Sequence, residues 1–180
     1  VQCLRARSDI VLTGAGTINE DSPSMNVRLK KIVASKAFDQ PKRYVFSKEL
    51  ALDWNAPFFN LPGQKVVVTS KRSLPKSARK IKNLSLLNCK SKGRFLDPKN
   101  FIEKISRLQI NNILLESGPN LLGSFGDVNL IDEFIFYISP EKLGSQAEYF
   151  YKGKNKINFF DNEQFDIVEE TQVGKDKKIV

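Results

Sequence analysis

The sequence of 180 residues contains no histidine. This absence excludes every site that needs an imidazole, including Ser-His-Asp triads, histidine metal centres and histidine general bases. Cysteine is nearly absent too, and the wide separation of Cys3 and Cys89 favours neither a disulfide framework nor a metal cluster. No apolar run approaches the length of a membrane helix, and no signal peptide is evident. We therefore expect one cytoplasmic domain with no metal ion and no membrane contact.

Positive charge is in excess, with 29 Lys and Arg against 20 Asp and Glu, a net charge of +9. Such a chain can bind nucleic acid, but the basic clusters are scattered, they are not interleaved with aromatic residues, and no nucleic-acid motif accompanies them. Lysine-rich solvated faces explain the composition more simply. A positive field also favours anionic small molecules, so nucleic acid is not the expected partner.

A glycine turn follows the first apolar run of the chain. Ile10–Leu12 has the pattern of a buried strand and leads into a turn that contains Gly14 and Gly16. Because glycine lacks a Cβ atom, a ligand can approach the backbone there, and N–H groups can point at an anion. The polar residues behind the turn are Thr17, Glu20, Asp21, Ser22 and Arg28. The segment predicts a loop that holds a phosphorylated small molecule, although a plain change of chain direction would use the same residues.

A second strand of this kind, Asn112–Leu115, ends in Glu116 and the turn Ser117–Pro119. A helix is expected to begin near Pro119, with Ser117 or Asn120 as its capping residue. The free N–H groups of a helix N-terminus form a suitable site for pyrophosphate. Two such turns in one chain favour a nucleotide cofactor held between them.

Strands alternate with helices over most of the chain, and strands alone close it. The expected fold is α/β with three layers, a mostly parallel central sheet and antiparallel C-terminal edge strands. The expected strands are 9–13, 43–47, 65–69, 84–87, 112–115, 134–139, 149–151, 164–172 and 177–180. The expected helices are the end of one at 1–8, then 73–82, 98–108 with Asp97 as its cap, and 119–125.

An ordered series of short motifs runs from Leu4 to about Gly144. The motifs are Leu4-Arg5-Ala6, Asp9, Gly14-Ala-Gly-Thr17, Asp21, Pro23, Arg28, Glu116-Ser-Gly-Pro119, Leu130-Ile-Asp-Glu133, Tyr137-Ile-Ser-Pro140 and Leu143-Gly144. Together they resemble the reductase domain of the bacterial riboflavin-biosynthesis deaminase/reductase. That domain is the 5-amino-6-(5-phosphoribosylamino)uracil reductase, and its fold is similar to that of dihydrofolate reductase.

The resemblance implies a reaction and a set of site residues. The reaction is hydride transfer from NADPH to the opened ribosyl group of the phosphorylated aminopyrimidine, which gives the ribitylamino product. The implied substrate-binding residues are Arg5, Met25, Arg28 and Glu116. The reduction also needs a proton donor, and the candidates are Glu116, an ordered water and a lysine that the family carries on its first strand. The implied cofactor-binding residues are Thr17, Asp21, Lys48, Gly118, Pro119, Asn120, Leu121, Leu122, Gly123 and Ser124.

The chain departs from the family pattern at several points. Met25 stands where leucine is usual, and Ser47-Lys48 replaces an Asp-Ser pair, so Lys48 is either a contact to the 2′-phosphate of NADPH or a surface lysine. Asp21 is likewise either a cofactor contact or a turn residue before Pro23. The family's first strand is missing, and the C-terminus breaks off within a strand. We therefore read residues 1–180 as a single reductase domain from a longer polypeptide.

The resemblance also implies partners. A zinc deaminase domain precedes the reductase in many bacteria, and its signature is absent from these residues. A homodimer is expected, in which Phe134, Phe136 and Tyr137 belong either to the subunit surface or to the core.

Three other functions remain open. The first is a dihydrofolate-reductase-like enzyme that acts on a pterin or another pyrimidine, although Arg5, Arg28 and Glu116 suit a phosphorylated aminopyrimidine better. The second is a basic α/β module that binds RNA. The third is a truncated domain that has kept a dimer surface and lost turnover.

Overall fold

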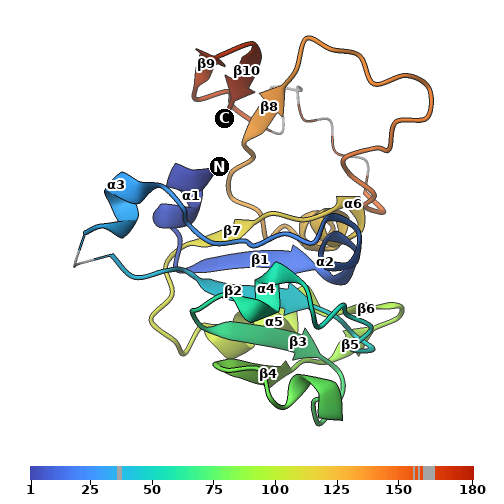
Figure 1. Ribbon diagram of the computed structural model, residues 1–180. Coiled ribbons are helices and arrows are strands. Elements are labelled where there is room, and N and C mark those ends of the chain that lie inside the picture. Colours follow the sequence, from blue (N-terminus) through green and yellow to red (C-terminus); the bar gives the residue numbers. More distant parts are fainter. Residues whose placement is uncertain (36–37, 156, 158, 160–164) are drawn as a thin grey trace.

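Five parallel strands form the central sheet of the computed structural model, which describes residues 1–35, 38–155, 157, 159 and 165–180 (Figure 1). The strands are β1 (Ile10–Gly14), β2 (Lys42–Phe46), β3 (Lys65–Thr69), β4 (Leu84–Asn88) and β7 (Ile113–Leu115). Their order is β4-β3-β2-β1-β7, so β1 lies between β2 and β7. The carboxyl ends of these three neighbours therefore meet at one edge of the sheet.

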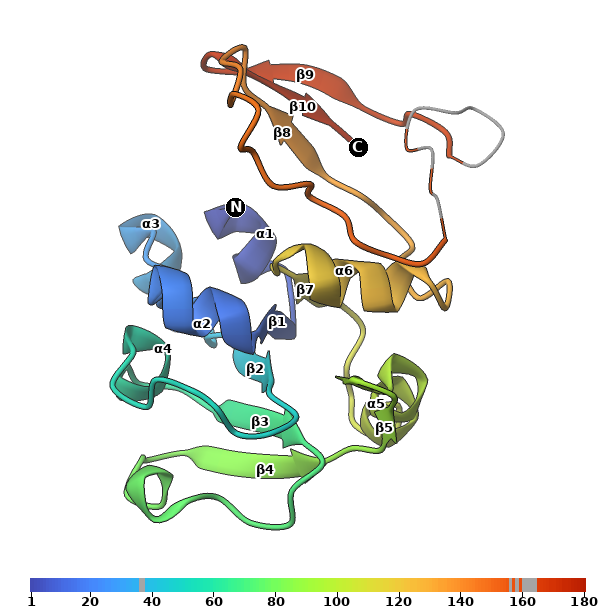
Figure 2. The same ribbon diagram turned by 90° about the vertical axis from the view of Figure 1, so that its right-hand side faces the viewer.

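Helices cover both faces of this sheet (Figure 2). On one face, α2 (Ala15–Asp21) and α4 (Pro57–Asn60) pack on alternate strand residues such as Val11 and Val45. On the other, α5 (Pro98–Ile105) and α6 (Pro119–Gly126) pack on Ile10, Leu12 and Phe46. Strands covered on both faces need apolar residues on both, which explains their near-continuous apolar sequences. The predicted three-layer α/β fold is confirmed.

The other elements that precede the C-terminal strands are short. They are α1 (Gln2–Ala6), α3 (Lys30–Val33), the 3₁₀ turn η1 (Lys76–Ala78), and the hairpin β5 (Ser91–Lys92) with β6 (Phe95–Leu96). No helix in the described part of the chain has the length and apolar character needed to cross a membrane.

Helix α5 shows how local signals place an element. Asp97 caps it by accepting a hydrogen bond from the Lys99 N–H at 3.0 Å, and Pro98 occupies its first turn, as predicted. Phe101 is fully buried, and its ring meets that of Phe46 edge-on at 4.9 Å. The predicted extension to Leu108 is wrong, because the helix ends at Ile105 and Leu108 is exposed.

Two further predictions of helix and loop were wrong. Residues 15–21 form helix α2 instead of a polar loop, because one buried residue, Ile18, is enough to anchor two turns on the sheet. Residues 73–82 contain only η1 instead of a helix, since Ala78 is the one buried residue of that turn and no apolar stripe supports more.

Three antiparallel strands form a separate sheet near the C-terminus, in the order β8-β10-β9. They are β8 (Phe136–Ile138), β9 (Glu170–Val173) and β10 (Asp176–Ile179). The views agree that this sheet stands beside α1 and α6, away from β4 (Figures 1 and 2). The predicted strand at 149–151 is wrong: no strand forms there, and the next residue, Lys152, is hydrogen-bonded to the first turn of α6. The predicted strand at 164–172 begins only at Glu170, and Gln164 lies outside the described residues.

The segment that returns from β8 is fastened along α6. The Lys152 N–H donates to the Pro119 carbonyl at 3.1 Å, and the Asp127 carboxylate accepts from two further backbone N–H groups, those of Lys154 and Asn155. A Cβ atom on Gly123 would lie only 2.5 Å from the backbone of Lys152. Gly123 is therefore the residue that allows this segment to lie directly on the helix.

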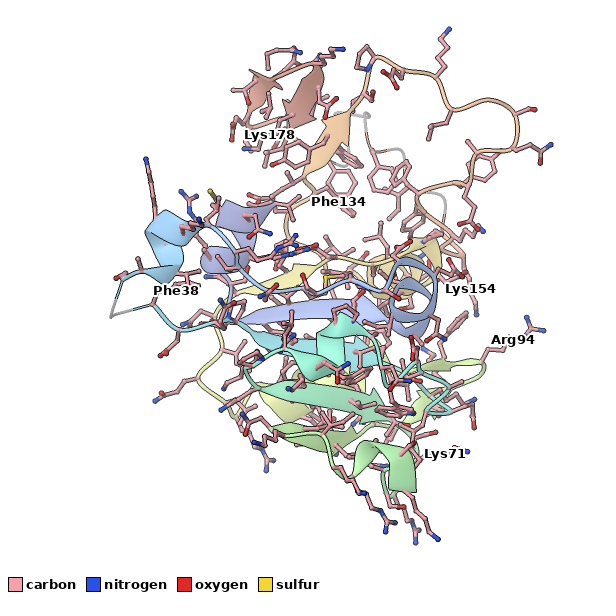
Figure 3. All side chains as sticks on the ribbon, viewed as in Figure 1. Phe38, Lys71, Arg94, Phe134, Lys154 and Lys178 are labelled. Carbon is pink, nitrogen blue, oxygen red and sulfur yellow. The ribbon has the colours of Figure 1, made fainter. Side chains whose placement is uncertain are left out.

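Aromatic rings hold the C-terminal part together. Phe134 meets Phe159 edge-on at 4.9 Å, and Phe136 meets Phe150 at 5.5 Å. Figure 3 shows Phe134 directed into the space below β8. Tyr137, by contrast, is exposed, so Phe134 and Phe136 contribute to internal packing while Tyr137 faces outward.

Candidate functional site

A pocket of about 820 Å³ opens at the carboxyl edge of the central sheet. It lies where β1 ends at Gly14, where β2 ends at Phe46 and where Glu116 follows β7. Clefts at this edge are the usual ligand sites of open α/β sheets, and this volume is within the range of small-molecule and cofactor sites.

The two glycine turns lie side by side in the lining of this pocket. They are side by side because β1 and β7 are neighbours, and the Glu116 N–H donates to the Leu12 carbonyl at 2.9 Å. A Cβ atom built on Gly118 would lie 3.9 Å from the Thr17 hydroxyl. Of the predicted site residues, the pocket is lined by Thr17, Asp21, Met25, Lys48, Glu116, Gly118, Pro119, Asn120, Leu121 and Ser124.

Four predicted residues do not line the pocket: Arg5, Arg28, Leu122 and Gly123. Arg5 lies behind Glu116 and donates two hydrogen bonds to its carboxylate. Arg28 is exposed, and its backbone N–H donates to the Gln2 side chain. Leu122 and Gly123 lie further along α6, and Gly123 contacts the returning C-terminal segment.

Arg5 and Glu116 form a bidentate ion pair at the base of the pocket. Arg5 Nε and Nη2 each donate to one oxygen of the Glu116 carboxylate, both at 2.7 Å. A third donor, Nη1, binds the Asn26 carbonyl at 3.1 Å. Arg5 is 8% exposed, while Glu116 reaches the pocket. The guanidinium therefore fixes the orientation of the carboxylate, whose oxygens can also accept hydrogen bonds from a ligand.

The N-terminus of α6 offers unpaired N–H groups. Gly118 is the capping residue, and no side chain among the described residues caps the helix, so the expected role of Ser117 or Asn120 is wrong. The Ser117 hydroxyl instead donates to the Gly118 carbonyl. The N–H groups of Asn120 and Leu121, in the first turn, have no acceptor within the helix and remain available to an anion in the pocket.

Met25 combines burial with a strained backbone. Its side chain is 4% exposed and lines the pocket, and its φ of 53° is in the left-handed region. That conformation costs a non-glycine residue on the order of 1 kcal/mol, and such positions cluster at ligand sites. The strain supports the assignment of Met25 to the site.

Lys48 joins β2 to the β5–β6 hairpin. Its ammonium donates to the Gly93 carbonyl at 2.9 Å, at the tip of the hairpin, where Gly93 has a φ of 63°. Through this contact Arg94, Phe95 and Leu96 form one wall of the pocket. Figure 3 shows Arg94 extending from that tip. The hairpin was missed from the sequence because its strands are only two residues long.

The charged side chains in the wall are mostly acidic. Four carboxylates, from Glu20, Asp21, Glu116 and Glu148, accompany two cations, Lys48 and Arg94. A phosphorylated ligand would therefore place its phosphates toward the start of α6 and the hairpin. Glu148 was missed entirely, because only the return of the C-terminal segment to α6 brings it here.

Comparison with known proteins identifies the family of this chain. The model of the RibD C-terminal domain matches residues 1–177. The chain belongs to the RibD C-terminal domain family. Over its full length it is 32% identical to the riboflavin biosynthesis protein RibD of Buchnera aphidicola subsp. Baizongia pistaciae, of which it covers 50%. It is 29% identical to the 5-amino-6-(5-phosphoribosylamino)uracil reductase of Buchnera aphidicola subsp. Acyrthosiphon pisum, with 100% of this chain and 89% of that protein covered.

Solved structures of RibD-family proteins share the fold. RibD of Acinetobacter baumannii superposes with a TM-score of 0.81 at 24% identity, over 99% of this chain and 47% of that one. The riboflavin biosynthesis reductase Rib7 of Saccharomyces cerevisiae superposes with a TM-score of 0.75 at 16% identity, over 99% and 76%. The chain spans about half the length of the RibD proteins that it matches.

Proposed function

We propose that this RibD-family chain is an NADPH-dependent reductase that converts 5-amino-6-(5-phosphoribosylamino)uracil to its ribitylamino product in riboflavin biosynthesis. The observation that carries the proposal is the pocket between two glycine turns, with Glu116 held at its base by Arg5. A relative with this reductase name aligns with the whole chain.

The pocket fits a nicotinamide dinucleotide in size and in its donors. The unpaired N–H groups of Asn120 and Leu121 suit the pyrophosphate, and Gly118 leaves space for it. Lys48 and Arg94 are the cations available to the 2′-phosphate of NADPH. Thr17 and Asp21 remain for the nicotinamide half. When bound, the cofactor supplies the hydride, and the protein aligns it with the substrate carbon.

The substrate half of the site is built around Glu116. Its carboxylate accepts hydrogen bonds from the N–H groups of the aminopyrimidine, and Met25 supplies an apolar contact. Arg28 meets the ribose phosphate where the substrate extends beyond the pocket lining. Because both carboxylate oxygens of Glu116 accept hydrogen bonds from Arg5, we assign delivery of the proton to an ordered water, with Glu116 as its orienting group.

A second substrate is favoured by one relative. The 2,5-diamino-6-ribosylamino-4(3H)-pyrimidinone 5′-phosphate reductase of Archaeoglobus fulgidus is 24% identical over 81% of this chain. Both compounds carry a ribosylamino phosphate on a pyrimidine, so the same carboxylate and cations suit both. They differ in a substituent of the pyrimidine ring, which Glu116 would contact.

The wider setting follows from the longer relatives. A Thermotoga maritima relative of the same fold is described as a deaminase/reductase, and we propose that this reductase works beside such a deaminase in the cytoplasm. We also propose a homodimer that covers exposed apolar residues of the antiparallel sheet, namely Tyr137, Ile138 and Val173.

The test is an assay in which the oxidation of NADPH with each pyrimidine in turn is monitored by the absorbance of NADPH. Oxidation with the aminouracil, lost in Gly118→Val, would support the proposal, and oxidation only with the diaminopyrimidinone would favour the second substrate. A titration with NADPH and with RNA at two salt concentrations tests the alternative that this chain is an RNA-binding module. Saturation by NADPH with a shallow salt dependence supports the reductase, whereas binding of RNA alone with a steep slope would refute it.

A further inference from the structure

A second pocket of about 690 Å³ lies at the opposite edge of the sheet. It opens where β3 begins at Lys65 and where β4 is preceded by Asn83, beside helix α4 and the segment before it. It shares no lining residue with the pocket at the carboxyl edge. Nothing in the proposed reductase reaction uses it.

Two buried cations meet beside this pocket. Lys65 is 2% exposed, and its ammonium donates to the carbonyls of Phe59 and Leu61, at 3.1 and 2.9 Å. Arg43 is 1% exposed and donates to the same Leu61 carbonyl at 2.9 Å and to that of Pro62 at 2.7 Å. Neither cation has a carboxylate partner among the residues that the structure describes.

The burial of these two cations lowers the pKa of both side chains. Burial lowers the pKa of Arg43 to about 10. Burial, and then the charge of Arg43, lowers the pKa of Lys65. Carbonyl dipoles stabilise part of this charge, but a buried cation gains most from an anion. An anion near Lys65 would therefore be bound with favourable energy.

Lys65 lines the pocket, and its ammonium has more donors than described acceptors. An ammonium has three N–H donors, and Lys65 uses two of them on described acceptors. Lys80 and Lys82 stand at the rim, exposed and without an ion pair among the described residues. The one carboxylate in the lining, Asp53, accepts from the Asn55 N–H at 3.0 Å. The balance of charge in the pocket is positive.

An aromatic wall accompanies these cations. Trp54 lines the pocket and is half-buried, and its ring lies 4.9 Å from that of Phe59 at an angle of 43°. A flat ring can pack on indole while an anionic group reaches the lysines. We propose that this pocket binds a small phosphorylated aromatic compound, with its ring against Trp54 and its phosphate near Lys65, Lys80 and Lys82.

Trp54 is the single tryptophan of the chain, so its fluorescence reports on this pocket alone. The experiment titrates the full chain with AMP, with adenosine and with inorganic phosphate. We expect a saturable change with AMP, and an affinity at least about tenfold weaker for adenosine and for phosphate, because each lacks one of the two contacts. No saturable change with AMP, or equal affinities for AMP and either fragment, would overturn the proposal.

Variants locate the response. Lys80→Gln with Lys82→Gln should weaken AMP binding roughly tenfold, while the control pair Lys30→Gln with Lys31→Gln, which removes the same charge outside both pockets, should not. Gly118→Val obstructs the other pocket and should leave the AMP response intact. An unchanged midpoint in the first pair, equal losses in both pairs, or loss of the response in Gly118→Val would refute the site.

Discussion

Replacing Arg5 by alanine should destabilise the fold and disable the substrate half of the pocket together. The change removes both hydrogen bonds to Glu116, each 2.7 Å long, and leaves a carboxylate whose side chain is only 21% exposed. The third hydrogen bond, to the Asn26 carbonyl, is lost as well.

The magnitude follows from burial. Removing one partner of a fully buried ion pair costs about 3–5 kcal/mol, because a desolvated charge remains. Water reaches part of the Glu116 carboxylate, so we expect a loss of about 2–3 kcal/mol in the free energy of unfolding. For a domain of this size that corresponds to a melting temperature lower by roughly 5–10 °C.

The assay is urea unfolding of Arg5→Ala beside the control Arg7→Ala, an exposed arginine at the end of the same helix α1. The control should change the free energy of unfolding by less than about 0.5 kcal/mol. A double-mutant cycle with Glu116→Ala should show a coupling of at least about 1 kcal/mol, since the double variant leaves no unpaired charge.

Binding and turnover separate the two halves of the site. At a temperature where Arg5→Ala is folded, kcat/KM for the pyrimidine should fall about 100-fold, because a misplaced carboxylate misaligns the substrate. The Kd for NADPH should hardly change, since Arg5 does not line the pocket. A stability loss no larger than that of Arg7→Ala, or additive effects in the cycle, would refute the reasoning.

Four further changes test other parts of the structure. Gly118→Val should weaken NADPH at least about tenfold without lowering the melting temperature, because its extended backbone accepts a side chain that then obstructs the pocket; wild-type affinity would contradict this. Lys48→Ala should reduce the preference for NADPH over NADH about tenfold, because the variant lacks the proposed ammonium contact to the 2′-phosphate. An unchanged ratio of the two Kd values would show that Lys48 does not contact that phosphate. Gly123→Ala should cost about 1–3 kcal/mol in unfolding, because its Cβ would meet the Lys152 backbone at 2.5 Å; a stability equal to wild type would show that the segment shifts freely. Two backbone N–H groups lower the pKa of Asp9 below its ordinary value of 3.8, so the carboxylate stabilises the fold above that pH, and this contribution disappears as the pH falls through the lowered value. In urea unfolding at a series of pH values, the free energy of unfolding should therefore fall less steeply with acid in Asp9→Asn than in the wild type. Parallel pH dependences of the two proteins would contradict this role.

Local signals predicted the central sheet well. The inner strands β1, β2 and β3 are short, mostly apolar runs, and such runs are recognisable because both faces of the strand are buried. The Asp97-Pro98 pair predicted the start of α5, because a helix cap acts within three residues of the chain. Helix α2 and the hairpin β5–β6 were missed because one buried residue or two paired residues leave no periodic pattern.

The candidate site was predictable where it depends on the ends of strands. Gly14 and Glu116 end neighbouring parallel strands, so their turns had to meet at one edge once the sheet order placed them side by side. Arg94 and Glu148 carry no comparable signal, because each reaches the pocket through a segment that is positioned by packing.

The sequence by itself determined the strand ends, the glycine turns and the family resemblance, because these depend on residues close together along the chain. Only the tertiary structure decided that Arg5 serves Glu116, 111 residues away, and that Lys48 holds the hairpin tip at Gly93. It also decided that two buried cations share the Leu61 carbonyl beside a second pocket. Such pairings depend on which strands are neighbours and on how far each side chain reaches, and neither is set by local propensity.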